Sequence, residues 1–165
     1  MKLSKRGEYA LRALIDLGLL HETGEPLVQI RSLAEKEKLP EKFLEQILVQ
    51  LKGAGYLDSK RGKKGGYFLR KPMDEIMLGD VVRLIDGPLA PIRCVSQTAY
   101  QPCTCPDPEH CGLRILMDDV RSAISAILDR HSLADIVGIT LKKLRRDKAS
   151  LPCLKSTANS RRSTA

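Results

Sequence analysis

The sequence predicts a mainly α-helical chain with a small β-wing: a winged helix-turn-helix domain followed by a long dimerisation helix. Three observations predict this class. Residues 30–52 hold two runs of helical apolar periodicity on either side of Leu39-Pro40. Residues 56–69 alternate in polarity around a basic turn rich in glycine. Residues 112–130 carry apolar side chains at alternating steps of four and three, the pattern of a coiled-coil seam.

Composition limits the possible classes of protein. A chain of 165 residues supports one domain, or one small domain with an appendage. Hydrophobic residues make up 42% of the chain and aromatic residues only 4%, which predicts an aliphatic core. The net charge of +8 favours a polyanionic partner without naming it. No apolar run reaches the length of a membrane span and no signal peptide opens the sequence, so we expect a cytoplasmic protein.

The sequence lacks the residue patterns of an enzyme. Gly62-Lys-Lys-Gly-Gly66 is rich in glycine and lysine, but it departs from the phosphate-loop pattern and lies in a hairpin rather than before a helix. The three histidines are scattered, so acid–base catalysis has no evident site. We therefore predict a protein that is not an enzyme.

The first predicted helix covers residues 4–20, and Ser4 is a suitable N-cap. Two short helices follow at residues 30–38 and 41–52, with Leu39-Pro40 as the turn between them. The second carries apolar residues at the i, i+3, i+4, i+7 spacing of one buried stripe. These are Leu44, Ile47, Leu48 and Leu51. Its opposite face carries Lys42, Glu45, Gln46, Val49 and Gln50.

A basic hairpin completes the winged helix. Its tip carries four cations, Lys60, Arg61, Lys63 and Lys64. An apolar stripe alone is usually ordinary core, and a basic tip alone is usually a solvated turn. Their occurrence together, in this order, predicts that the second helix enters a major groove of duplex DNA. The predicted DNA-binding residues are Lys42, Glu45, Gln46, Gln50, Lys60, Arg61, Lys63 and Lys64.

Residues 87–111 differ from the rest of the chain. They follow a short predicted helix at residues 78–85 and contain four of the five cysteines and five of the nine prolines. A long irregular loop in a compact domain is often functional. The spacing Cys94-x8-Cys103-x-Cys105-x5-Cys111 has no CxxC pair, so it suits an iron–sulfur cluster better than a zinc ribbon.

The predicted helix at residues 112–130 has an apolar seam formed by Leu113, Met117, Val120, Ile124 and Ile127, widened by Leu116 and Leu128. It could pack on its own domain, but the winged helix already buries its own stripes, so we predict a homodimer. A symmetric dimer would bind a palindromic operator. Residues 138–165 are rich in cations and are predicted to form a disordered tail, in which Cys153 has no assigned role.

These elements divide the chain into four segments. Residues 1–86 form the DNA-binding domain, 87–111 the cysteine loop, 112–137 the dimerisation helix and 138–165 the tail.

Four motifs resemble a known family. They are the opening Met1–Leu14, the Glu41-Lys-Phe-Leu-Glu-Gln-Ile-Leu48 helix, the Arg61-Gly-x-x-Gly-Gly-Tyr67 wing and Asp86-Gly-Pro-Leu-Ala-Pro91. Together they resemble the IscR/NsrR-type winged-helix transcription regulators of bacteria over residues 1 to about 137. The resemblance implies a dimeric, DNA-binding transcription regulator, expected here to be a repressor. It also implies that Arg61 reaches the minor groove.

The resemblance further implies a [2Fe-2S] or [4Fe-4S] cluster held by Cys94, Cys105 and Cys111. The fourth ligand is open. Arg114 stands where IscR-like members have a histidine, and Glu8 stands where NsrR-like members supply an acid from the partner subunit. Cys103 is the competing candidate. The cluster would sense iron–sulfur status, redox state or nitric oxide. Some relatives hold no cluster, so a regulator controlled by thiol oxidation or a protein partner is the alternative.

Overall fold

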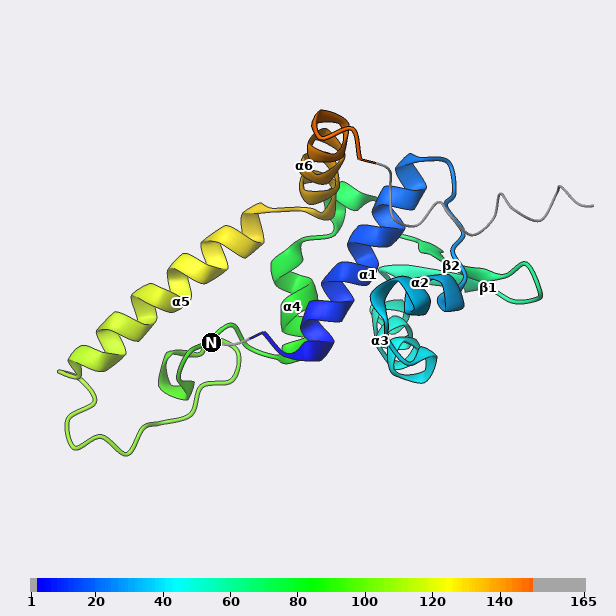
Figure 1. The fold of residues 1–165 in the computed structure, drawn as a ribbon. Helices are drawn as coiled ribbons and strands as arrows, with labels where there is room; N and C mark the ends of the chain where they lie inside the picture. The colour runs from blue at the N-terminus through cyan, green and yellow to red at the C-terminus, as the bar shows by residue number, and fades with distance from the viewer. Residues whose placement is uncertain (1–2, 150–165) are drawn as a thin grey trace, which may run out of the picture.

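The computed structural model describes residues 3–149, and Figure 1 shows their arrangement. Six α-helices, two strands and two short 3-10 turns are found in that part of the chain. In order they are α1 (Lys5–Glu22), α2 (Ile30–Glu37), α3 (Glu41–Gly53), β1 (Leu57–Lys60), β2 (Gly66–Leu69), η1 (Met73–Glu75), α4 (Leu78–Asp86), η2 (Arg93–Val95), α5 (Gly112–Arg130) and α6 (Leu133–Arg146).

Helix α1 is the centre of the fold and contacts α2, α3, α4, α6 and β2 (Figure 1). Its buried face includes Leu14 and Leu17, and its N-cap is Ser4, as predicted. The Ser4 hydroxyl accepts a hydrogen bond from the Gly7 amide at 3.0 Å, which satisfies one free N–H of the first turn. The core around α1 is aliphatic, as the low aromatic content predicts.

Helices α2 and α3 form the predicted helix-turn-helix. Lys38 adopts a left-handed conformation with φ of 54° and ends α2. The Leu39 amide then donates to the Ala34 carbonyl at 2.9 Å, which closes the tight turn before α3. Strands β1 and β2 pair antiparallel with Leu57 opposite Leu69, and they form the predicted wing. The fold class is therefore confirmed.

Helix α5 extends away from this body (Figure 1). It packs against α4 and η2, yet none of its residues is buried. Within residues 3–149, no helix combines the length and apolar character that crossing a membrane requires.

The tail prediction is wrong for residues 138–146, which belong to α6. This helix begins with a capping box formed by Ser132 and Asp135, and it packs on α1 and η1. Val137 is buried so closely against α1 that a Cβ at Gly18 would lie 2.7 Å from its methyl group. Leu141 and Leu144 extend the same stripe, which the run of cations obscures in the sequence. Cys153 and the rest of the predicted tail, 150–165, lie outside the described residues.

Candidate nucleic-acid interface and cysteine loop

Helix α3 separates its apolar and polar sides sharply. Leu44, Ile47, Leu48 and Leu51 are fully buried against the body. Lys42, Glu45, Gln46 and Val49 are exposed on the opposite side. Val49 is 55% exposed, although it is β-branched and apolar, and it lies one helical turn from Gln46. The exposed face thus offers a cation, an amide, a carboxylate and a methyl surface, the four chemistries that read base edges in a major groove.

Gln50, a predicted DNA-binding residue, is hydrogen-bonded within the chain. Its Nε2 donates to the carbonyl oxygen of Leu84 in α4 at 2.9 Å, and its Oε1 accepts from Arg6 of α1 at 3.0 Å. Both ends of the amide are therefore engaged within the chain. The sequence correctly placed Gln50 on the polar face of α3. That face borders α4, and helical periodicity alone cannot predict which element packs beside it.

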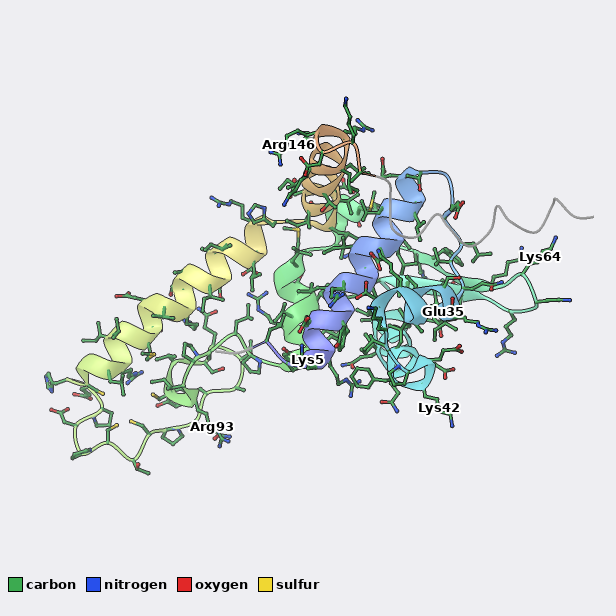
Figure 2. The ribbon with its side chains drawn as sticks, viewed as in Figure 1. Lys5, Glu35, Lys42, Lys64, Arg93 and Arg146 are labelled. Atoms are coloured by element: carbon green, nitrogen blue, oxygen red, sulfur yellow. The ribbon has the colours of Figure 1, made fainter. Side chains whose placement is uncertain are left out.

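The wing carries its cations at an exposed tip. Lys60, Arg61, Lys63 and Lys64 are all exposed, and Gly62 has a φ of 112°, which lets the chain turn between them. Figure 2 shows Lys42 on α3 and Lys64 at the wing tip, both pointing away from the body. The structure therefore places the predicted wing residues where a phosphate backbone could meet them.

The wing is anchored next to the helix-turn-helix. Val28 and Tyr67 exchange two backbone hydrogen bonds of 2.9 and 2.8 Å, which ties the segment before α2 to β2. Gln29 Nε2 also donates to the Lys63 carbonyl at 3.2 Å. A groove lies between α2, α3 and the wing, and Glu45 lines it. Burial raises the pKa of the Tyr67 phenol, which also lines the groove.

The cysteine loop places its four thiols in a chain of pairwise contacts. Cys94 in η2 is buried, whereas Cys103, Cys105 and Cys111 are half-buried. The Cys105 thiol hydrogen-bonds with the sulfurs of Cys103 and Cys111, and Cys103 also contacts Cys94. The Cys105 backbone N–H donates to the Cys103 sulfur, and this bond holds the pKa of the Cys103 thiol below its ordinary value. The hydrogen bond to Cys103, with burial, raises the pKa of Cys105 to about 11.

Four soft sulfur donors on one irregular loop fit an iron–sulfur cluster in chemistry. Among residues 3–149, no three His, Cys, Asp or Glu side chains form a group that could hold a single metal ion. The thiols instead form a chain of contacts from Cys94 through Cys103 and Cys105 to Cys111. A cluster spans more space than one ion and tolerates such a spread. The sulfur donors of Cys94, Cys105 and Cys111 therefore match a cluster in chemistry, while the contacts link Cys94 to the other two only through Cys103.

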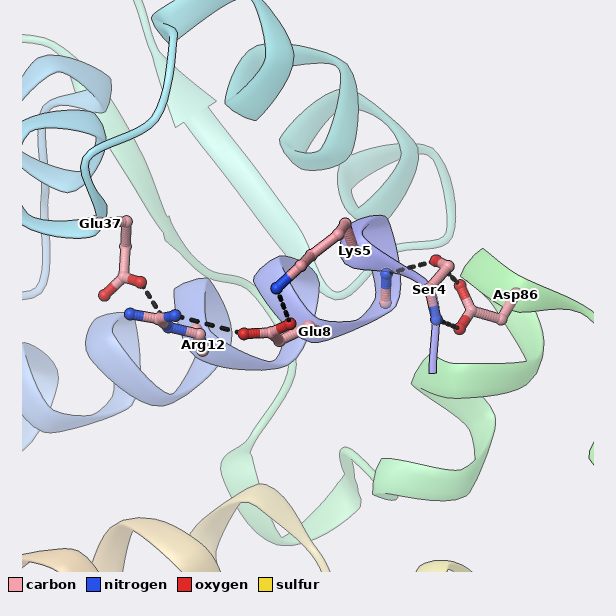
Figure 3. Close-up of polar contacts among 7 residues, drawn as sticks. Ser4, Lys5, Glu8, Arg12, Glu37 and Asp86 are labelled. Atoms are coloured by element: carbon pink, nitrogen blue, oxygen red, sulfur yellow. Dashed lines mark hydrogen bonds and ion pairs between the residues drawn. The ribbon is translucent and has the colours of Figure 1, made fainter. Parts of the chain in front are cut away.

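Glu8 lies in an ion-pair network on α1 (Figure 3). Its carboxylate pairs with Lys5 at 2.8 Å and Arg12 at 3.4 Å, and Arg12 also pairs with Glu37 at the end of α2. The hydrogen bond from Lys5 lowers the pKa of Glu8. Within the described chain, Glu8 is thus held by cations of its own helix and is not grouped with the thiols.

Helix α5 presents an apolar face that its own chain leaves exposed. Leu113, Leu116, Val120 and Ile127 are exposed large hydrophobics, with Leu116 at 55%. Ala123 is exposed on the same face. This seam differs from the predicted one, because Met117, Ile124 and Leu128 are half-buried. The prediction identified the right helix, but its seam is rotated by part of a turn from the exposed one. The reason is that the side of α5 that packs on α4 and η2 is also apolar.

Known proteins match this architecture over most of the chain. A family model, Rrf2, described as an iron-dependent transcriptional regulator, matches residues 3–139. The regulator CymR of Bacillus subtilis is 33% identical over 140 residues, covering 85% of this chain and 92% of the relative. The regulator NsrR of Geobacillus kaustophilus is 32% identical over 154 residues, covering 93% of this chain and 96% of the relative.

Solved structures of related regulators have the same fold over most of the chain. That of CymR, described as the global cysteine regulator of B. subtilis, has a TM-score of 0.70 and 32% identity over 84% of this chain and 98% of that one. The structure of T. potens IscR has a TM-score of 0.63 and 26% identity, covering 92% and 93%. The predicted family is confirmed, and the relatives' names are consistent with a protein that is not an enzyme. The chain belongs to the Rrf2 family of DNA-binding transcription regulators.

Proposed function

We propose that this protein is a homodimeric repressor that binds a palindromic operator, and that an iron–sulfur cluster in the cysteine loop adjusts its operator affinity. The observation that carries the DNA-binding part is the joint surface of α3 and the wing, where exposed base-reading and cationic side chains lie side by side. The observation that carries the sensing part is the chain of four neighbouring thiols.

In this proposal the exposed face of α3 reads the base sequence of the operator. Gln46 can pair bidentately with an adenine, and Glu45 can accept from a cytosine amino group. Val49 offers its methyl groups to a thymine methyl. Lys42 and the wing cations Lys60, Lys63 and Lys64 bind phosphates and set the register without reading sequence. Arg61 reaches into the minor groove. Replacing Gln46 with Ala is expected to change base preference, whereas a uniform loss across sequences would argue against direct readout.

Dimerisation belongs to the exposed seam of α5. Leu113, Leu116, Val120 and Ile127 repeat at coiled-coil spacing, so the same helix of a second copy can cover them about a two-fold axis. Two copies related in this way present two recognition helices to successive major grooves, about 34 Å apart along the DNA. This arrangement predicts a palindromic operator with half-sites about one helical turn apart.

Cys94, Cys105 and Cys111 are the proposed protein ligands of the cluster. When bound, the cluster supplies a centre that reacts with oxidants or nitric oxide and that depends on iron supply. Cys103 and Glu8 are the candidates for the fourth ligand. Cys103 is already in contact with Cys94 and Cys105, whereas Glu8 must leave Lys5 and Arg12 and act across the dimer. These contacts favour Cys103.

The alternative is a cluster-free regulator controlled by thiol oxidation or a protein partner. The contact between Cys103 and Cys105 favours it, because neighbouring thiols can form a disulfide. The two thiols give two electrons and two protons to a peroxide, whose O–O bond breaks to yield two waters from hydrogen peroxide, or an alcohol and a water from an alkyl hydroperoxide. The likeness to CymR, described as a cysteine regulator, also supports this alternative.

An oxygen-free preparation separates the two. The protein is purified anaerobically, its visible spectrum is recorded, and iron and acid-labile sulfide are measured per chain. The proposal predicts a coloured protein whose iron is lost in Cys94→Ser, Cys105→Ser and Cys111→Ser, and kept in a Cys153→Ser control. Cys103→Ser and Glu8→Ala then identify the fourth ligand. A colourless, iron-free protein that still binds its operator would support the alternative.

A further inference from the structure

The last turn of α4 is tied to two helices by adjacent residues. The Leu84 carbonyl accepts a hydrogen bond from Gln50 of α3 at 2.9 Å. Arg83 donates two hydrogen bonds, of 2.7 and 2.6 Å, to the two carboxylate oxygens of Asp129 in α5. This bidentate geometry fixes both distance and orientation. The recognition helix and the proposed dimerisation helix therefore meet on one turn of α4.

The same turn is also tied to the start of α1. Asp86 accepts a hydrogen bond from the Ser4 amide at 2.8 Å and another from the Ser4 hydroxyl (Figure 3). The fit is close, because a Cβ at Gly7 would lie 2.6 Å from the Asp86 carboxylate. Gly87, the next residue, adopts a φ of 85° and begins the cysteine loop 87–111. The loop thus leaves the body directly after a residue that holds Ser4, the N-cap of α1.

The start of the cysteine loop meets this turn of α4, and its end reaches the turn only through the length of α5. The loop begins one residue beyond Asp86, and it ends at Cys111, the N-cap of α5. Helix α5 returns to α4 through Asp129 and Arg83. A change in the loop can therefore reach Arg83–Asp86 directly through Gly87, and at a distance through α5 and Asp129.

Gln50 connects that segment to the DNA-binding surface. Its amide has no polar atom left over, since one end binds Leu84 and the other binds Arg6. It lies one residue after Val49 and one turn after Gln46, the side chains proposed to read bases. A displacement of Leu84 would thus move the C-terminal half of α3 relative to the major groove of bound DNA. Even a small misplacement there would change the contacts that read bases.

We infer that the last turn of α4, Arg83–Asp86, is the joint through which the cysteine loop sets the position of the recognition helix, with Gln50 as the positioning residue. The inference rests on the proposed function, because it assigns the route by which the loop changes operator affinity. In this proposal Gln50 does not read bases; it holds α3 in position against α4.

A double-mutant cycle tests the joint without any cluster. Operator affinity is measured for Gln50→Ala, Asp86→Ala and the double variant in the full chain. Because both residues act through one turn, we expect the double effect to differ from the product of the single effects by about threefold or more. The matched control cycle uses Lys63→Ala, on the wing, with Asp86→Ala and should be multiplicative within about twofold. A multiplicative Gln50 cycle overturns the joint.

A second measurement asks whether Gln50 carries the signal. The anaerobic protein is loaded with ferrous iron and sulfide, and a second portion is treated with a chelator; the ratio of the two operator affinities is the switching ratio. Gln50→Glu keeps the size of the side chain and its bond from Arg6, but loses the donor to Leu84. It should bring the ratio close to one, whereas Lys63→Ala on the wing should lower both affinities and keep the ratio. A Gln50→Glu variant with the wild-type ratio overturns the positioning role.

Together the two measurements distinguish a failure of the proposed cluster control from a failure of the proposed α4 joint. A wild-type ratio of one refutes control by the cluster, which is part of the proposed function. The mutant cycle then still decides whether the α4 turn couples to α3, because it compares affinities of cluster-free protein alone.

Discussion

The winged-helix body and the long helix α5 are both amphipathic, but they differ in what covers their apolar sides. In the body, the stripe of α3 is fully buried, with Leu44, Ile47 and Leu48 at 0% exposure. In α5 no residue is buried, and Leu113 and Leu116 are more than half exposed. Within residues 3–149, the body therefore buries its own apolar stripe, whereas the apolar side of α5 stays exposed. A second copy is the proposed cover for that exposed side.

The largest expected effect concerns the body. Leu48→Ala removes a fully buried side chain and should lower the free energy of unfolding by about 2–5 kcal/mol. Chemical denaturation followed by circular dichroism measures this. Val49→Ala, at the next and exposed position, is the matched control and should change stability by less than about 0.5 kcal/mol. Equal losses in the two variants would contradict the assignment of the buried face.

The second prediction concerns α5. Leu116→Asp places a charge in the exposed seam, so it should dissociate the dimer and weaken operator binding by about 100-fold or more. The body should keep its unfolding temperature. Analytical ultracentrifugation gives the assembly state. Ile139→Asp on α6 is the control, since Ile139 is equally exposed at 56% but lies off the seam. A Leu116→Asp variant that remains dimeric would place the interface elsewhere.

A smaller effect is expected at the wing. Arg61→Ala should weaken operator binding about tenfold and reduce the slope of log affinity against log salt by about one. Lys142→Ala removes an exposed cation from α6 and should leave both quantities unchanged. Fluorescence anisotropy at several salt concentrations measures both quantities. Equal changes in affinity and salt slope for the two variants would mean that Arg61 contributes only through the net charge of the protein.

The smallest expected effect is chemical, in the cysteine loop. The thiolate is the form that reacts with iodoacetamide. The pKa of Cys103 is lowered and that of Cys105 is raised to about 11, so in the reduced, metal-free protein Cys103 should be alkylated at lower pH than Cys105. Mass spectrometry of each peptide across pH 6–11 follows this order. Cys103→Ser should lower the pKa of Cys105, because the bond to Cys103 is the main cause of its shift. Identical pH profiles for the two thiols would contradict their contact.

The sequence predicted most of the body, because local signals and burial agree there. The Leu44–Leu51 stripe, the Ser4 cap and the basic hairpin each follow from spacing within one element, and all three are found. Features that depend on a tertiary neighbour could not be predicted from spacing. Gln50 lies beside α4, and only the fold reveals that its amide is engaged there.

Helix α6 and the seam of α5 show the same limit. The apolar stripe of α6 has its partner, α1, more than a hundred residues away in sequence, and the intervening cations suggested a tail. In α5 two apolar stripes lie side by side, one against its own chain and one exposed. Periodicity identifies both as apolar but cannot say which of them the chain itself covers.

The most direct test of control by the cysteine loop is the operator affinity of one anaerobic preparation of the dimer, measured with its iron–sulfur cluster and again after removal of iron by a chelator. The account predicts that the two affinities differ by about fivefold or more, and that Cys105→Ser removes the difference. Equal affinities, from a protein that holds a cluster and binds its operator, would contradict it.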